Sequence, residues 1–371
     1  MAGDHPMPRV KKPKPVRAAT LADVGRVAGV SAMAASAVLN DARTSSRISP
    51  ATRQRIMQAA ARLAYRPNAA ARALANHRMS TIGVAMVIVD GELNQYFLEL
   101  FNGILESAAK HEQNTTVFAL HNWHGDTARL SSICDGRIDG LILIAPTFPP
   151  AEIMLPAHTP FVSIHANSLL PNVVNVESDE EHGAHAMVRH LIALGHRRIM
   201  HLAGPAGLTG TNRRILGYKR ALAGARLPFD PALLVPADFD SKHGRDAMHG
   251  WLRRHAGEPL PQAVFCVNDG VATGCLSALA EAGLRVPDDI SVAGFDDSLA
   301  ARTTVPQITT VRQPLRAMGA CAADLLLQRI AQHNGAQAAA SAKNVVFPTE
   351  VVQRASVSAP PAVARLVPAL R

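Results

Sequence analysis

Residues that build cross-links, metal centres and membrane spans are scarce in this chain. Its 371 residues include four cysteines, Cys134, Cys266, Cys275 and Cys321, which show no paired or metal-binding spacing. Unpaired thiols of this kind favour a reducing compartment. No stretch of about 18 uncharged apolar residues occurs, which excludes a membrane-spanning helix. No apolar run follows the basic N-terminus, so the sequence predicts no signal peptide and a cytoplasmic location.

Spacings typical of metal, nucleotide and nucleophilic sites are also missing. His182 and His185 lie three residues apart, but the HExxH order and a third ligand are absent, so both fit a solvated helix face. The glycine-rich segment GPAGLTG (204–210) precedes a helix and could hold an anion or a ligand hydroxyl. It lacks the GxGxxG pattern and a following Walker lysine, which argues against nucleotide binding. We therefore expect no enzyme activity, no metal and no cofactor.

The positive charge of the chain is confined to its first fifth. Residues 1–80 hold 14 Lys and Arg against 3 Asp and Glu, whereas residues 81–371 hold 24 against 26. A basic module on a near-neutral body is typical of a phosphate-binding head. Residues 1–18, rich in Pro, Lys and Arg, are expected to be a disordered basic arm, with a plain solvated tail as the alternative.

Residues 20–40, TLADVGRVAGVSAMAASAVLN, have the pattern of two short helices around a tight turn. Thr20 has the capping-box spacing to Asp23, and Ser31 is a good N-cap for the second helix. The inward faces are predicted to hold Leu21, Val24, Val27, Ala28, Ala35, Val38 and Leu39. Two helices joined in this way make a helix-turn-helix, whose second helix can enter the DNA major groove.

A third helix follows, with Ser49 as its cap and Pro50 at its first position. Its buried stripe is predicted to consist of Ile56, Ala59, Ala60 and Leu63. Together the three helices make a headpiece over residues 19–66. The next helix formers, AAARALA (69–75), span only two turns, and a helix that short is marginal in water. We therefore expect the hinge helix, residues 67–79, to fold only against a partner.

From residue 80 the pattern alternates between apolar strands and helices. The expected strands are 80–90, 114–120, 138–146, 159–165, 197–204, 263–269 and 290–297, and the expected helices are 97–111, 181–194, 212–225, 270–283 and 315–333. Apolar strands that alternate with helices predict parallel sheets covered on both faces. Ligands of such sheets bind beyond the carboxyl ends of the strands.

Polar and aromatic residues lie at several of these strand ends. They are Asn94, Tyr96, Phe97, Arg214, Asp269, Asp296 and Asp297. Carboxylates accept hydroxyl hydrogen bonds, aromatic rings pack on the apolar face of a sugar, and an Arg fork holds paired oxygens. The alternatives are core packing for Tyr96 and Phe97, a helix N-cap for Asp269, and a turn cap for one of Asp296 and Asp297.

Five strings in this sequence carry a resemblance to a known family, and they are TLADVGRVAGVS, VLN (38–40), YRPNAAARAL, TIGV and VPDDISVAGFDD (286–297). The strings occur in the order that the family has, so the chain strongly resembles the lactose-repressor (LacI/GalR) family of bacterial transcription regulators. The resemblance covers residues 19–354. It implies a small all-α helix-turn-helix headpiece, a hinge helix and a two-lobed α/β effector domain like the periplasmic sugar-binding proteins. We place this domain at 80–355, with the N-lobe at 80–178 and 306–338 and the C-lobe at 179–305 and 339–355. Residues 356–371 are expected to be a loose tail.

The resemblance also assigns DNA-contacting positions. These are Thr20, Ser31, Ala32, Met33, Ser36, Ala37, Asn40 and Thr52 in the headpiece, and Asn68, Arg72 and Leu74 in the hinge. Leu74 would act as a wedge in the minor groove, although a lone exposed Leu is ordinarily unremarkable. The family commonly has Thr and Arg at the positions of Ala34 and Ala37. This recognition helix therefore offers methyl surface rather than bidentate base contacts, so specificity leans on the hinge and on DNA shape.

The effector positions implied by the family are Tyr96, Phe97, Arg214, Phe239 and Asp269, and the strand-end argument adds Asn94 and Asp296. His165 stands where many members have Asp, which would alter ligand preference. The resemblance implies a repressor that binds a palindromic operator as a homodimer, with a tetramer as the alternative, and that responds to a sugar or sugar acid. Prolines in the tail favour the dimer. The alternative is an intracellular sugar-binding module or sugar-processing enzyme with the same body.

Overall fold

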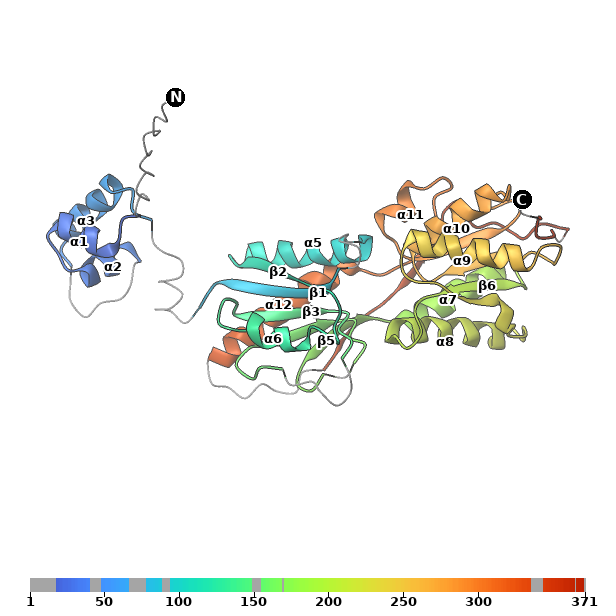
Figure 1. The fold of residues 1–371 in the computed structure, drawn as a ribbon, viewed down its shortest axis with the longest axis horizontal. Helices are drawn as coiled ribbons and strands as arrows, with labels where there is room; N and C mark the ends of the chain where they lie inside the picture. Colours follow the sequence, from blue (N-terminus) through green and yellow to red (C-terminus); the bar gives the residue numbers. More distant parts are fainter. Residues whose placement is uncertain are drawn as a thin grey trace, which may run out of the picture. The chain divides into compact units, whose positions relative to one another are not determined.

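The computed structural model describes residues 18–40, 48–66, 78–88, 94–148, 155–168, 170–334, 343–363 and 365–369. The chain divides into two compact units, Met1–Met79 and Ser80–Arg371. Figure 1 shows the first unit as a small group of helices and the second as two lobes of sheets and helices. Each unit has its own apolar core, so each is described by itself.

The first unit consists of α1 (Leu21–Ala28), α2 (Ala32–Leu39) and α3 (Pro50–Arg62). The predicted capping box is confirmed, because the Asp23 amide donates to Thr20 Oγ1 and the Thr20 amide donates to Asp23 Oδ2 at 3.0 Å. The predicted caps of α2 and α3 are confirmed as well, with Ser31 and Ser49 each accepting from an amide of the first turn. Gly29 ends α1 with a φ of 68°, a left-handed conformation that glycine adopts without strain.

Small apolar side chains fill the core of this unit. The buried set is Val24, Ala28, Ala35, Val38, Ile56, Ala59 and Ala60, with Leu21, Leu39 and Leu63 partly buried against it. The prediction was wrong for Val27, which is 46% exposed because an eight-residue helix presents a narrower buried face than the sequence pattern suggested.

Among the described residues, no single helix meets the length and hydropathy of a membrane span; one pair, α1 with α2, meets them together but is bent by 103°.

The second unit contains two six-stranded sheets. The N-lobe sheet has the order β11-β5-β4-β3-β1-β2 and all of its neighbours pair in parallel. Its strands are β1 (Thr81–Val87), β2 (Asn114–Leu120), β3 (Gly140–Ile144), β4 (Phe161–Ile164), β5 (Val174–Ser178) and β11 (Val345–Phe347). The C-lobe sheet has the order β12-β10-β9-β8-β6-β7, and β12 is its one antiparallel strand among the described residues. Its strands are β6 (Ile199–Ala203), β7 (Leu234–Pro236), β8 (Ala263–Cys266), β9 (Ser291–Asp296), β10 (Thr309–Arg312) and β12 (Glu350–Val352).

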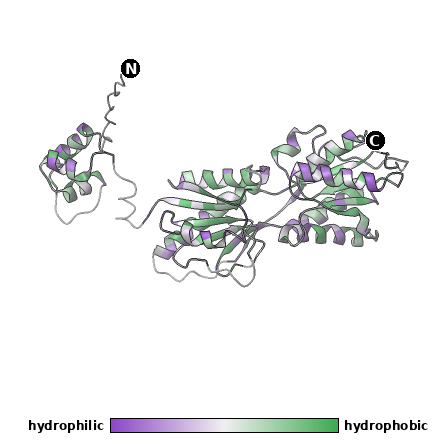
Figure 2. Cartoon of the chain, in the orientation of Figure 1, coloured by the Kyte–Doolittle hydropathy of each residue, from purple (hydrophilic) through white to green (hydrophobic). Residues whose placement is uncertain are grey.

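Helices cover both faces of each sheet (Figure 1). The N-lobe has α5 (Gln95–Lys110), α6 (Thr127–Ile133) and α12 (Leu315–Asn334). The C-lobe has α7 (Glu180–Ala193), α8 (Thr209–Gly224), α9 (Ser241–Arg254), α10 (Asp269–Glu281), α11 (Leu299–Thr303) and the short 3₁₀ helix Pro231–Leu233. Figure 2 shows that the strands between these helices are largely hydrophobic, as expected for parallel sheets buried on both faces.

Glycines let paired helices approach closely. A Cβ atom on Gly103 of α5 would lie 1.9 Å from the Arg316 carbonyl oxygen of α12, and one on Gly319 would lie 2.0 Å from the Leu100 oxygen. The pair α9 and α10 is built in the same way, because a Cβ on Gly274 would lie 1.8 Å from the Ser241 oxygen. Any larger residue at these positions would push the helices apart.

The chain crosses between the lobes three times, and two of the predicted crossing points were wrong. Residues 309–312 form β10, which pairs with β9 in the C-lobe sheet, so the second crossing follows Arg312 rather than residue 305. Residues 345–347 form β11, which pairs with β5 in the N-lobe sheet, so the third crossing follows Phe347 rather than residue 338. Both strands have three or four residues, too short for an apolar period to reveal them.

The described part of the C-terminal segment is packed, which corrects the prediction of a loose tail. Val367 is 2% exposed in the C-lobe core, and its amide and carbonyl bond to Glu258 and Gly257. Leu366 forms a bridge with Pro259, and Arg365 pairs with the buried Asp289 at 2.9 Å. The segment therefore acts as a strap across the C-lobe, held by backbone pairing that its prolines do not interrupt.

Candidate DNA interface and effector site

The exposed face of α2 is short and largely without charge. Ser31, Ala32 and Asn40 are exposed, and Met33 is 81% exposed. Ser36 is half-buried, and its Oγ accepts from Asn40 Nδ2 at 3.1 Å. Ala37 is 7% exposed but is not part of the apolar core of this unit, so its predicted DNA contact stays a prediction. The face can therefore offer methyl and thioether surface to thymine methyl groups.

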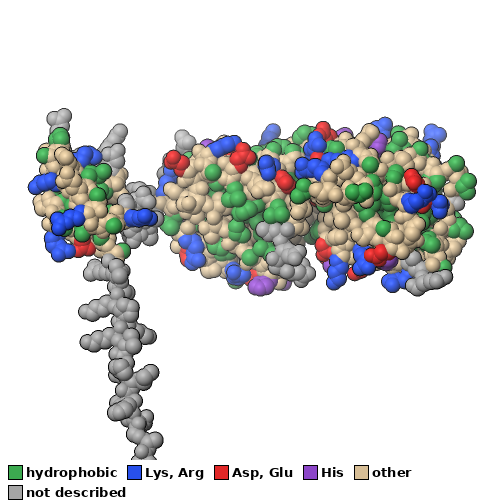
Figure 3. Space-filling view, turned by 90° about the horizontal axis from the view of Figure 1, so that it is seen from above, with side chains coloured by type: hydrophobic (Ala, Val, Ile, Leu, Met, Phe, Trp, Pro, Cys, Tyr) green, Lys and Arg blue, Asp and Glu red, His purple; other side chains and the backbone are tan. Residues whose placement is uncertain are grey.

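Two further residues predicted to contact DNA, Thr20 and Thr52, lie at helix starts. Thr20 is half-buried, and its Oγ1 donates to Asp23 Oδ2 at 2.7 Å. Thr52 lies in the first turn of α3, where its Oγ1 is 2.9 Å from Ser49 Oγ and 3.4 Å from Arg55 Nη2. Figure 3 shows several blue Lys and Arg side chains on this unit. Asn68, Arg72 and Leu74 lie outside the described residues, so their predicted roles stay predictions.

In the second unit, side chains at the carboxyl ends of strands from both sheets form one chain of hydrogen bonds. Tyr96 Oη lies 2.7 Å from His165 Nδ1, and His165 Nε2 lies 3.1 Å from Ser178 Oγ. Ser178 Oγ donates to Gln313 Oε1, and Gln313 Nε2 donates to Asp296 Oδ1 at 2.6 Å. This chain, which we call the interlobe network, joins α5, β4 and β5 of the N-lobe to β9 and the segment after β10.

Arg214 of α8 adds the main cation to this region. Its Nη2 donates to Glu180 Oε1 at 2.7 Å, and its Nη1 donates to the Val267 carbonyl at 2.6 Å. The guanidinium lies over the Phe295 ring, 4.1 Å from the ring centroid. Gly210, the last residue of the glycine-rich segment 204–210 and the second residue of α8, gives the Glu180 carboxylate room, because a Cβ there would lie 2.6 Å from Glu180 Oε1. That glycine therefore accommodates a carboxylate rather than an anionic ligand.

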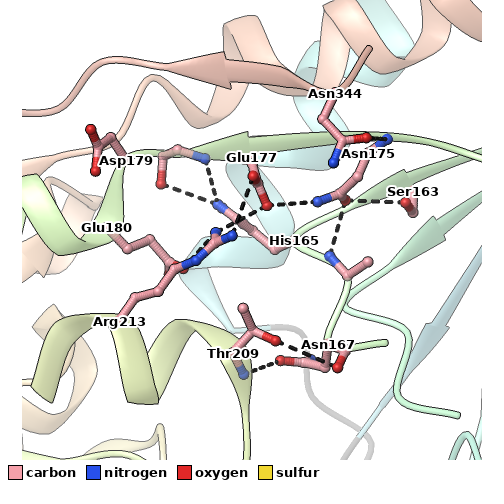
Figure 4. A network of polar contacts seen from close by, with 12 residues as sticks. Ser163, His165, Asn167, Asn175, Glu177, Asp179, Glu180, Thr209, Arg213 and Asn344 are labelled. Carbon is pink, nitrogen blue, oxygen red and sulfur yellow. Dashed lines mark hydrogen bonds and ion pairs between the residues drawn. The ribbon is translucent and has the colours of Figure 1, made fainter. Parts of the chain in front are cut away.

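Figure 4 shows a second set of contacts next to the interlobe network. Arg213 Nη1 and Nη2 donate to the two carboxylate oxygens of Glu177 at 3.0 and 3.3 Å. Asn175 Nδ2 also donates to Glu177, at 2.8 Å. The Thr209 amide donates to Asn167 Oδ1 at 2.8 Å. These contacts connect β5 and the segment after β4 in the N-lobe to the start of α8 in the C-lobe.

Burial sets the protonation states of the interlobe network. Burial raises the pKa of Asp296 to about 6, against the opposing effects of Arg214 and of the Gln313 hydrogen bond. Burial lowers the pKa of His165, which favours a neutral ring between Tyr96 and Ser178. Burial followed by the charges of Glu180 and Asp296 raises the pKa of Tyr96 well above its usual value. Tyr96 and His165 are therefore neutral hydrogen-bonding groups at neutral pH.

Two acidic residues from the sequence analysis are committed to the protein itself. Asp269 is fully buried and accepts from Thr310 Oγ1 at 2.6 Å and from the Ser298 amide at 2.8 Å, so its ligand-binding role stays a prediction. The alternative that it is the N-cap of α10 was wrong, because Asn268 fills that position. Asp297 pairs with Arg312 and Arg354 rather than capping a turn.

The other predicted effector positions either belong to the interlobe network or pack against the cores of the lobes. Asn94 caps α5 by accepting from the Phe97 amide at 3.1 Å. Tyr96 and Phe97 are partly buried against the N-lobe core, 5.3 Å apart in an edge-to-face arrangement. Phe239 is partly buried against the C-lobe core. Tyr96, His165, Arg214 and Asp296 thus remain the predicted residues that the fold brings together.

Sequence reasoning missed Ser178, Glu180 and Gln313. Glu180 and Ser178 flank the first crossing, and Gln313 follows the second crossing. The signal was available for Glu180, because two acidic residues open a helix directly after an apolar strand.

Among the described residues, no group of three His, Cys, Asp or Glu side chains could hold a metal ion.

A separate cavity of about 350 Å³ lies at the opposite edge of the N-lobe sheet, where β4 begins. Its lining includes Phe161, Asn172, Arg329 and His333. None of the predicted effector residues lines it.

Comparison with known proteins agrees with this division of the chain. The family model described as "Bacterial regulatory proteins, lacI family" matches residues 20–68, and the model described as "Periplasmic binding protein-like domain" matches residues 188–357. The HTH-type transcriptional repressor PurR of Haemophilus influenzae (strain PittEE) is 31% identical over 319 residues, which are 84% of this chain and 91% of that protein. The ribose operon repressor of Haemophilus influenzae (strain ATCC 51907 / DSM 11121 / KW20 / Rd) is 31% identical over 321 residues, 85% of this chain and 93% of that protein.

Solved structures of the same architecture cover nearly the whole chain. The lac repressor dimer bound to operator and the anti-inducer ONPF has a TM-score of 0.77 and 26% identity, covering 92% of this chain and all of that chain. The complex of the transcriptional regulator CelR with cellobiose has a TM-score of 0.66 and 28% identity, covering 91% of this chain and 99% of that chain. This chain therefore belongs to the lacI family of bacterial regulatory proteins, which are DNA-binding transcriptional repressors and not enzymes.

Proposed function

We propose that this protein is an effector-responsive repressor that binds a palindromic operator as a homodimer in the cytoplasm and controls genes of carbohydrate metabolism. The headpiece supplies a DNA-reading helix, and the interlobe network supplies polar groups from both lobes in one place. The proposal is also supported by the names of the relatives, which include a ribose operon repressor, and by the cellobiose complex of a structural neighbour.

The observation that carries this proposal is the interlobe network. Tyr96 and His165 follow N-lobe strands, whereas Asp296 is the last residue of the C-lobe strand β9, so a ligand that contacts both sides depends on the angle between the lobes. Such a ligand binds one lobe arrangement more tightly than another and shifts the population toward it. If operator binding requires the other arrangement, each ligand weakens the other by the same factor. A tenfold effect on operator affinity requires about 1.4 kcal/mol of differential binding.

The hinge would transmit this shift. Residues 67–79 connect the two units, and their sequence predicts a helix too short to be stable alone. In a dimer, two such segments would fold side by side over the minor groove, and a changed N-lobe arrangement would separate them. This role of the hinge is a proposal from the sequence, because residues 67–77 lie outside the described residues.

An electrophoretic shift assay tests the proposal. DNA fragments selected by the full chain are titrated with protein in the presence and absence of candidate sugars. We expect sequence-specific binding that at least one sugar changes by tenfold or more. A chain that lacks residues 1–78 should keep effector binding and lose DNA binding, because the second unit has its own core. Absence of sequence-specific binding by the full chain at every salt concentration would contradict the proposal.

The alternative from the sequence, a sugar-processing enzyme with the same body, is not supported. The family to which the chain belongs consists of DNA-binding regulators. The carboxylates near the interlobe network are engaged by Arg213, Arg214 and Gln313.

A further inference from the structure

The charge of Arg214 is already matched inside the protein. Its ion pair with Glu180 is 2.7 Å long, and the two side chains are 8% and 4% exposed. The second terminal nitrogen of Arg214 donates to the Val267 carbonyl, and Phe295 covers one face of the guanidinium. A ligand carboxylate could take the bidentate position on Arg214 only by displacing Glu180. That displacement would leave a buried carboxylate without its cation, which is costly.

The neighbouring cation is matched as well. Arg213 donates to both carboxylate oxygens of Glu177, and its Nη1 lies 3.9 Å from the second oxygen of Glu180. Asp296 adds another carboxylate whose described hydrogen-bond partner is the neutral amide of Gln313. Around the interlobe network, three carboxylates thus face two guanidinium groups. An anionic ligand would add a fourth negative charge to a set whose cations are both engaged.

The remaining groups are suited to hydroxyls. Asp296 is an acceptor, Gln313 is a donor and an acceptor, and Tyr96 Oη and Ser178 Oγ can each donate or accept. Tyr96 and Phe97 add aromatic surface beside them. A ring that carries several hydroxyl groups and no charge can use these partners without disturbing either Arg–Glu pair.

We propose that Glu180 is a specificity-determining residue that makes the interlobe site accept an uncharged polyhydroxylated ligand and reject a sugar acid of the same shape. This inference rests on the proposed function, because it concerns the effector of that site, and it narrows the effector class that the sequence leaves open. Glu180 acts by occupying Arg214, and Gly210 gives its carboxylate the space to do so.

The test uses the full chain and matched pairs of probes. Each pair consists of a neutral sugar and its acid: glucose with glucuronate, galactose with galacturonate, and sorbitol with gluconate. Thermal shift at pH 7.5 identifies binders, and calorimetry gives the affinities. We expect at least one neutral member to raise the melting temperature of the wild-type protein. Its acid partner should bind at least tenfold more weakly.

The variant Glu180→Gln should reverse this preference. It frees the charge of Arg214, so we expect acid affinity to rise at least tenfold while neutral affinity changes less than threefold. The double variant Glu180→Gln with Arg214→Gln should lose that gain. The control is Glu181→Gln on the same helix, whose carboxylate pairs with the exposed Arg220 and should leave both affinities unchanged.

Two results on the wild-type protein overturn the proposal without any variant. One is tighter binding of an acid than of its neutral partner, and the other is a panel in which no neutral member binds. An unchanged acid-to-neutral ratio in a folded Glu180→Gln protein would overturn it too. The operator shift assay is run beside these measurements, so loss of the proposed function is detected separately: it would appear as absent DNA binding, whatever the ligand preference.

Discussion

Burial decides which role each acidic side chain of the C-lobe takes. Asp269 and Asp296 both end a strand in the sequence, and both looked like ligand-binding residues. The structure separates them, because Asp269 is fully enclosed by Thr310 and the Ser298 amide, whereas Asp296 bonds to Gln313 in the interlobe network. Sequence position alone could not distinguish them, since the difference depends on how α10 packs on β9.

Asp269 should make the protein less stable as pH rises. Burial, together with the nearby Asp296 charge, raises the pKa of Asp269 to about 8, whereas an unfolded Asp titrates near 3.9. Between these values the folded state holds a proton that the unfolded state has released, so stability falls with pH. We expect Asp269→Asn to remove on the order of 2–4 kcal/mol of this fall between pH 5 and 8.

Urea unfolding at several pH values, followed by tryptophan fluorescence, checks this prediction. The control is Asp246→Asn, an exposed residue on α9, which should keep the wild-type pH profile. A profile for Asp269→Asn parallel to that of the wild type would show that the buried carboxyl does not carry the pH dependence.

Met33 should contribute to operator specificity. It is the most exposed large apolar side chain of the recognition helix, and a flexible thioether adapts to thymine methyl groups. We expect Met33→Ala to weaken specific operator binding by about 1–2 kcal/mol, in the range of a single lost base contact. Binding to non-specific DNA should stay the same.

Fluorescence anisotropy with operator and scrambled duplexes measures both affinities. Met57 of α3 is 56% exposed and provides a matched Met→Ala control that should leave both unchanged. Equal losses on the two duplexes for Met33→Ala would contradict a base-reading role.

At the scale of elements, long apolar strands and capped helices were predictable, and short edge strands were not. The strands β1, β3, β8 and β9 are recognisable in the sequence as apolar runs. By contrast, β7, β11 and β12 have three residues each, and only pairing with a neighbour defines them. Helix α9 was missed although Met248, Trp251 and Leu252 have helical spacing, because charged residues and histidines dominate the rest of the segment.

Close helix pairs predict a steep cost for adding one methyl group. A Cβ on Gly274 of α10 would overlap the Ser241 carbonyl of α9, so we expect Gly274→Ala to destabilise the C-lobe by about 1–3 kcal/mol or more. Gly224 ends α8 with nothing within 4 Å of its Cβ position, so Gly224→Ala should stabilise by about 0.4–1 kcal/mol. Urea midpoints of the two variants test the opposite signs, and a neutral Gly274→Ala would mean that the helices separate freely.

At the scale of the whole molecule, charge is divided between the two units. The first 80 residues carry the entire net positive charge, and the remaining 291 residues carry slightly more acid than base. Operator binding should therefore fall steeply with salt, by about 10³-fold or more between 50 and 200 mM if six or more phosphates are contacted. Binding of an uncharged effector to the same protein should change little.

Parallel titrations of operator and effector over this salt range check the division. Equal salt sensitivity of both would mean that the effector site also exchanges ions. The sequence predicted this division and the strand ends where the residues of the interlobe network lie. The sequence could not predict which carboxylate pairs with Arg214. Glu180 lies next to Arg214 of α8 only because the chain passes from the N-lobe to the C-lobe just before α7 begins.

The C-terminal strap matters for anyone who engineers this protein. The sequence pattern of residues 356–371 suggests that the chain could be truncated near residue 355. That truncation would remove Val367 from the C-lobe core and leave an apolar cavity there. The shortened product is expected to be prone to aggregation, and its failure could be mistaken for a defect in regulation. Purification handles and fluorescent reporters therefore belong after the strap, with its whole length retained.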